Sequence, residues 1–111
     1  MKESWKIFID SNSIKNATIV KSKFENLLGI EVSENSPEPY HKGGFVFSIE
    51  VDTHKGSWSE IAVGVIAKAQ LVGRSWQLSG KIVEEVDAWT NDSSISGIQS
   101  IHVQCMNINA S

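Results

Sequence analysis

The sequence predicts an α+β protein with a single domain over residues 1–111. We expect a mixed, mostly antiparallel sheet and two helices in the order β-α-β-α-β-β, with both helices packed on one face. Two observations lead to this prediction. An apolar stripe with helical spacing covers residues 58–72, and alternating apolar residues cover 45–52, 75–83 and 98–106.

The helix over residues 58–72 has a start signal, a buried face and a stop signal. Ser57 and Glu60 form an S-x-x-E capping box, and Gly73 stands where a left-handed residue commonly ends a helix. At about 100° per residue, six apolar side chains fall on one arc: Ile61, Ala62, Val65, Ile66, Ala69 and Val72. Because Lys68 is the only Lys or Arg on the polar face, we expect a core helix and not a membrane-surface helix.

The N-terminal region predicts a strand followed by a less certain element. Trp5, Ile7 and Ile9 alternate with Lys6, Phe8 and Asp10, which is typical of a strand with one better-buried face. In the stretch over residues 14–28, a second S-x-x-E pair, Ser22 and Glu25, favours a helix of about two turns. Alternation around residues 18–22 leaves a strand open as the alternative.

Two further stretches have an irregular pattern. Residues 31–44 contain both prolines of the chain, Pro37 and Pro39, and predict a loop. Just after the strand expected at 75–83, the alternation fails at Glu84 and Glu85. We expect either a β-bulge at that point or a strand that projects beyond the core.

Composition excludes several classes of protein. The chain is 41% hydrophobic and 21% charged, which is ordinary for a globular domain. A net charge of −3 argues against a nucleic-acid partner. No apolar run is long enough to span a membrane, and no apolar run follows Met1 as one does in a signal peptide. With Cys105 as its single cysteine, the chain can form no internal disulfide. Because no signal peptide is recognised, we expect a cytoplasmic location.

Charge is distributed unevenly along the chain. Residues 1–23 carry five lysines against two acids, whereas residues 82–111 carry four acids and no Lys or Arg. A solvated strand end and turn would explain these acids, and a docking surface for a basic partner is the alternative. The candidate partner-binding residues are Glu84, Glu85, Asp87, Trp89 and Asp92, with Glu50 and Asp52 possible neighbours.

Candidate catalytic groups form no recognisable motif. His54, His102 and Lys81 could make an acid–base set, but nothing in the sequence brings them together. The three histidines, including His41, lack metal-ligand spacing, so we expect no metal and no cofactor. Cys105 lies in an apolar alternation and is expected to be a buried small hydrophobe.

The segment W-x-L-x-G-x-I-x-E-E-x-D-A-W (residues 76–89), followed by SGIQSIH (residues 96–102), resembles the immunity proteins of bacterial toxin systems. These include the immunity proteins of contact-dependent growth inhibition. The resemblance implies a specific inhibitor of a toxin domain, often a nuclease, and it transfers no site by position. A phage-encoded inhibitor of a host nuclease, a small enzyme using His54 and His102, and a ligand-binding or oligomeric module are the alternatives.

Overall fold

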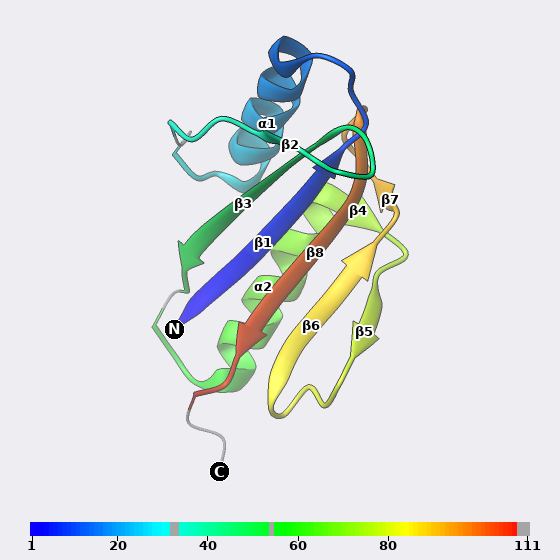
Figure 1. Cartoon of the computed structure of the whole chain (residues 1–111). Helices are drawn as coiled ribbons and strands as arrows, with labels where there is room; N and C mark the ends of the chain where they lie inside the picture. The colour runs from blue at the N-terminus through cyan, green and yellow to red at the C-terminus, as the bar shows by residue number, and fades with distance from the viewer. Residues whose placement is uncertain (32–33, 54, 109–111) are drawn as a thin grey trace.

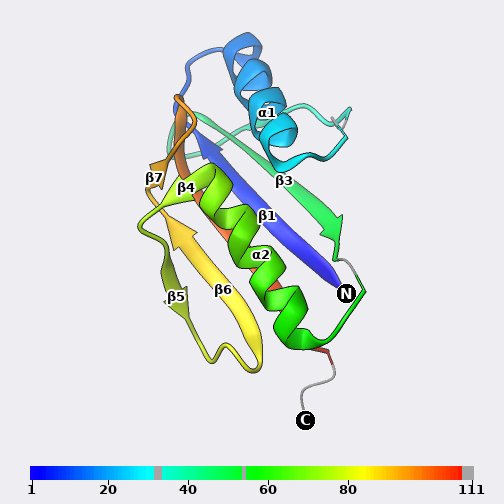
Figure 2. The same ribbon diagram turned by 180° about the vertical axis from the view of Figure 1, so that it is seen from behind.

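The computed structural model describes residues 1–31, 34–53 and 55–108, which form a six-stranded sheet, a two-stranded sheet and two helices. The larger sheet has the order β2-β3-β1-β8-β6-β5, and each pairing between its described strands is antiparallel. Both helices lie on one face of this sheet (Figures 1 and 2). The α+β class is therefore confirmed. The elements are β1 (Lys2–Ile9), α1 (Ile14–Leu28), β2 (Glu38–Pro39), β3 (Phe45–Asp52), α2 (Trp58–Val72), β4 (Gly73–Arg74), β5 (Gln77–Ser79), β6 (Glu85–Thr90), β7 (Asp92–Ser93) and β8 (Ile98–Met106).

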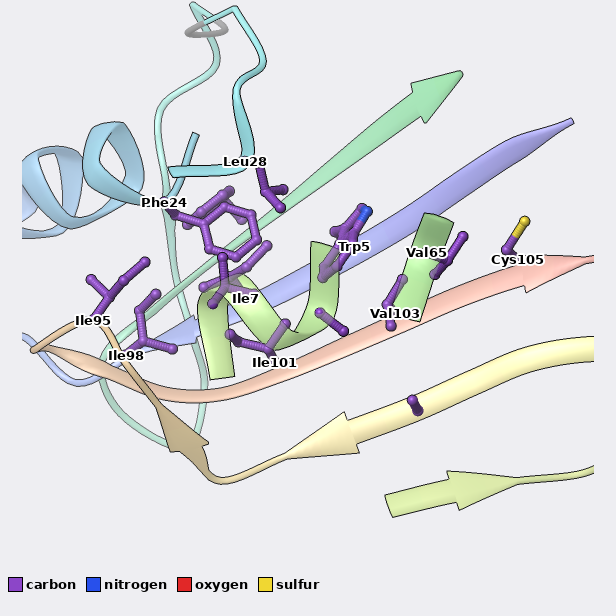
Figure 3. Packing of buried hydrophobic residues seen from close by; sticks show 14 of the residues in the cluster. Trp5, Ile7, Phe24, Leu28, Val65, Ile95, Ile98, Ile101, Val103 and Cys105 are labelled. Atoms are coloured by element: carbon purple, nitrogen blue, oxygen red, sulfur yellow. The ribbon is translucent and has the colours of Figure 1, made fainter. Parts of the chain in front are cut away.

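The core lies between the helices and the central strands β1 and β8. Trp5, Ile7 and Ile9 alternate with exposed or half-buried neighbours along β1, as the sequence predicts, and they are buried beneath the helices. Ile7 pairs with Phe47 of β3 and with Ile101 of β8, so all three side chains share the core face. Figure 3 shows Ile7 of β1 close to Phe24 of α1, and Val103 of β8 close to Val65 of α2.

Helix α1 is longer than predicted, and the strand alternative for this stretch is wrong. The helix begins at Ile14 because the Ser13 hydroxyl accepts a hydrogen bond from the Asn16 backbone N–H at 3.2 Å. It ends at Gly29, which has a left-handed φ of 76°. Ser22 therefore lies within the helix, and Glu25 binds the Lys21 ammonium group at 2.7 Å instead of closing a capping box.

Helix α2 has the predicted bounds, but it ends differently from the prediction. The capping box is confirmed, with the Glu60 backbone N–H donating to the Ser57 hydroxyl at 3.3 Å. Gly73 is extended (φ −163°, ψ 172°) and not left-handed, because the chain passes straight into β4. A Cβ on Gly73 would lie 2.9 Å from Thr90 Cγ2, so close packing is what requires glycine there. Ile66, expected on the buried arc, is only half-buried on the flank of the helix.

Only residues 77–79 of the strand predicted over 75–83 are a strand, β5, which is the first arm of a hairpin. Strand β5 ends at Ser79, and Gly80, with φ 72°, begins a turn in which the backbone N–H groups of Glu84 and Glu85 donate to the Lys81 carbonyl. The chain then returns as β6, which pairs with β5. Neither a bulge nor a projecting strand explains Glu84, because this residue lies in the turn. The Trp58 indole N–H anchors the turn to α2 by donating to the Ile82 carbonyl at 2.7 Å.

The expected loop over 31–44 contains the two-residue strand β2. Glu38 pairs with Val46 and Pro39 with Phe45, so β2 forms one edge of the sheet. Proline fits this position because an edge strand leaves one row of backbone N–H groups unpaired. Residues 32 and 33 of the expected loop lie outside the described residues, as does His54.

Two matched isoleucine truncations test this account of the core. Ile7 is 0% exposed, whereas Ile19 on α1 is 47% exposed. We expect Ile7→Ala to lower the free energy of unfolding by about 2–5 kcal/mol, because it removes buried methyl groups and leaves a cavity. Ile19→Ala should change it by less than about 0.5 kcal/mol. Urea denaturation measures both variants, and equal losses would contradict the core described above.

Candidate functional site

The sheet has a second face, opposite the helices, that no helix of the described residues covers (Figure 1). We call it the open face. Antiparallel partners point to the same side of a sheet, so the strand register places its residues in rows. One row runs from Glu50 through Ser4 and Gln104 to Asp87, and the next runs from Ser48 through Lys6 and His102 to Trp89.

Three of the predicted partner-binding residues share the open face of β6. Glu85, Asp87 and Trp89 are two residues apart along the strand, so their side chains point the same way. Trp89 is 37% exposed and lies between Gln77 of β5 and His102 of β8. The structure therefore brings together an exposed aromatic side chain and two carboxylates at one side of the open face.

Asp87 is held in place by two side chains from β8. His102 Nε2 lies 2.6 Å from Asp87 Oδ1, and the Gln104 amide donates to Asp87 Oδ2 at 3.3 Å. The residues 87 and 102 are 15 positions apart in the sequence and become neighbours only because β6 pairs with β8. Asp87 is thus an oriented carboxylate within a small polar network, and not a free surface acid.

The other predicted acids lie apart from this group. Glu84 is in the β5–β6 turn, and Asp92 on β7 pairs with Arg74 of β4 at 3.2 Å. Glu50 and Asp52 lie on the open face of β3, which is separated from β6 by β1 and β8. With strands spaced about 4.8 Å apart, Glu50 lies about 14 Å across the sheet from Asp87.

Asp52 forms an exposed ion pair with Lys2, whose ammonium group lies 3.0 Å from Asp52 Oδ1. The hydrogen bond from Lys2, together with its positive charge, lowers the pKa of Asp52 below its ordinary value. The same hydrogen bond and the carboxylate charge raise the pKa of Lys2. Part of the acidic charge on β3 is therefore offset locally.

The candidate catalytic groups are not gathered into one site by the described residues. His102 contacts Asp87, Lys81 lies in the β5–β6 turn, and His54 is among the residues that the structure does not describe. No group of three His, Cys, Asp or Glu side chains within 1–31, 34–53 and 55–108 could hold a metal ion. Cys105 is buried as expected, and burial, followed by the negative charge of Glu3, raises the pKa of its thiol.

Two features of the open face are missing from the predicted partner-binding residues. Lys6, at the centre of the sheet, places a positive charge in the row that holds Trp89. Near the C-terminal end of β1, the rings of Phe8 and Tyr40 meet edge to face with centroids 5.1 Å apart. The alternation along β1 already predicts that Lys6 and Phe8 share a face, but the contact with Tyr40 depends on how β2 and its loop fold back.

No family model, curated protein or solved structure matches the chain. Among the described helices, none is long and apolar enough to cross a membrane.

The Lys2–Asp52 pair gives a prediction about pH. Since the pKa of Asp52 is lowered in the folded protein, the pair contributes stability above the unfolded pKa of Asp52. This contribution is lost as the pH falls through the lower, folded pKa. In an NMR titration, the Asp52 carboxyl should titrate below an ordinary aspartate, and Lys2→Gln should move its midpoint upward. An unchanged midpoint in Lys2→Gln would show that Lys2 is not the cause.

Proposed function

We propose that this protein is a cytoplasmic immunity protein that binds and neutralises a basic toxin domain, such as a nuclease, through the β6 side of its open face. The observation that carries the proposal is the exposed indole of Trp89 on a sheet face that the described helices leave uncovered. The resemblance of residues 76–89 and 96–102 to immunity proteins supports the same conclusion.

Trp89 has the character of an interface anchor. Interface hot spots are enriched in tryptophan and are surrounded by polar contacts that exclude water. Here Asp87 is the neighbour of Trp89 on the same face of β6, and Glu85 is the next residue along that face. His102 and Gln77 flank Trp89 on the neighbouring strands. A partner that covers the indole would remove apolar surface from water and could satisfy the polar groups around it.

The charges on the open face favour a basic partner on one side. Glu85 on the open face, and Glu84 in the adjoining β5–β6 turn, have no ion-pair partner among the described residues, whereas Asp52 is paired with Lys2. Lys6 lies on the central strand, so the acidic character increases from β1 toward β6. Nuclease active sites are basic because they bind phosphates, and complementary charge accelerates association with such a surface. A phage-encoded inhibitor of a host nuclease would use the same chemistry.

A small enzyme is the second candidate, and one contact favours it. An imidazole oriented by a carboxylate, as His102 is by Asp87 at 2.6 Å, is a common general-base arrangement. This candidate requires RNA, ester or phosphoester turnover by the purified protein that disappears in His102→Ala. The docking proposal requires that the purified protein show no such turnover.

Binding kinetics against the product of the neighbouring gene test the docking proposal. We expect Trp89→Ala to weaken binding by about 2 kcal/mol or more, because it removes the aromatic anchor. Glu85→Lys should chiefly slow association, and this effect should shrink as salt rises, because exposed charges are screened beyond about 10 Å at 0.1 M.

Two exposed positions away from the open face of β6 provide matched controls. Leu78→Ala removes an exposed apolar side chain from the helix side of the sheet, and Glu34→Lys reverses an exposed charge in the segment before β2. Both should bind like the parent protein. If Trp89→Ala and Glu85→Lys remain folded and also bind like the parent, the proposed docking surface is wrong.

A further inference from the structure

A groove of about 430 Å³ lies between α2 and the β5–β6 hairpin, on the helix side of the sheet. Its floor consists of Val86, Ala88 and Val103, which are buried side chains of β6 and β8. The half-buried Ile66 of α2 forms one wall, and Leu78 of β5, which is 61% exposed, forms the other. The groove is thus separated from the open face by the sheet itself.

The groove exists because the sheet is wider than the helix that covers it. Strand β5 extends the sheet past α2, and the residues where the helix and sheet come together are small: Ala69, Gly73 and Ala88. Protein interiors are otherwise packed closely, with few voids larger than a water molecule. An apolar space of this size is within the range of small-molecule sites, about 300–1,000 Å³.

Polar groups gather at one end of the groove, where α2 passes into β4. Among the described residues that line the groove, Arg74 is the only charged one, and Gln70 and Ser75 lie near it in the chain. The Arg74 guanidinium contacts Asp92 through one terminal nitrogen at 3.2 Å. A guanidinium has five N–H donors, so donors remain for a second acceptor.

The backbone at this end is held in an unusual conformation. Ser75 has a φ of 54°, and within the described part of the chain it is the one non-glycine residue with a positive φ. Strained residues of this kind concentrate at ligand-binding and active sites. The next residue, Trp76, is fixed by its indole N–H, which donates to the Ala69 carbonyl at 2.9 Å. The indole ring is therefore a fixed apolar part of the groove lining, two positions along the chain from Arg74.

We propose that this groove binds a compact apolar carboxylic acid of one or two rings. The rings would lie over Val86 and Ala88 between Ile66 and Leu78, and the carboxylate would accept hydrogen bonds from Arg74. Apolar walls with a few polar groups at one end are the usual composition of a small-molecule site. Planar carboxylates suit arginine because both oxygens can be bound at once. This inference does not depend on the proposed docking at the open face.

A matched pair of probes tests the site: naphthalene-2-carboxylate and its neutral analogue, naphthalene-2-methanol. In ¹⁵N NMR titrations, naphthalene-2-carboxylate should give saturable shifts at the Trp76 indole and at Leu78, and none at Trp89. Arg74→Gln should weaken naphthalene-2-carboxylate about tenfold, the equivalent of one charge-assisted hydrogen bond, and leave naphthalene-2-methanol unchanged. Leu78→Ser should weaken both probes. Lys81→Gln, which removes an exposed cation outside the groove, should affect neither.

Three results would overturn the proposal. The first is the absence of saturable shifts at Trp76 and Leu78 in the parent protein, and the second is equal weakening of both probes by Arg74→Gln. The third is movement of the same signals with protein concentration alone, which would identify a second copy of the chain as the occupant. Trp89→Ala should leave both probe affinities unchanged, so failure of the docking proposal and failure of this one can be told apart.

Discussion

The structure depends on the position of β1 in the middle of the sheet, between β3 and β8. Because successive side chains of a strand point to opposite faces, each residue of β1 lies either on the core face or on the open face. Trp5, Ile7 and Ile9 thereby become the floor beneath both helices, and Lys6 and Phe8 become part of the open face. A shift of one residue in the register of β1 would exchange these two sets.

A buried charge ties this strand to α2. Glu3, which is 1% exposed, faces the core, and its two carboxylate oxygens have separate partners: the Trp5 indole N–H at 3.1 Å and the Lys68 ammonium at 2.7 Å. A buried carboxylate without partners would cost several kcal/mol in desolvation, so the pairing is required once Glu3 is on this face. An apolar residue at position 3 would pack in the core without needing a polar partner. We therefore interpret the Glu3–Lys68 ion pair as a contact that fixes the position of α2 over β1.

Regular periodicity accounts for what the sequence could predict. Strands β3 and β8 and helix α2 were predictable because their alternation or capping box is local. The start of α1 at Ser13 is hard to predict because the residues Ser-Asn-Ser at 11–13 are equally typical of a turn. The β5–β6 hairpin is hard to predict because Gly80 and Ile82 continue the strand alternation through the turn.

In the candidate site, the shared face of Glu85, Asp87 and Trp89 follows from the two-residue period of a strand. Predicting the contact between Asp87 and His102 requires knowing that β6 pairs with β8. Predicting the groove requires knowing that the sheet is wider than α2. A local sequence pattern reveals neither of these facts.

Hydroxyl-radical footprinting of the protein, free and bound to the toxin domain that we propose as its partner, tests most directly the claim that the open face is the recognition surface. Trp89 and Tyr40 belong to the open face and its margin, whereas Trp58 and Trp76 lie on the helix side of the sheet. We expect the complex to suppress oxidation of Trp89 strongly and to leave Trp58 and Trp76 as reactive as in the free protein. Suppression at Trp58 and Trp76, with Trp89 still reactive, would place the partner on the helix side and contradict the account.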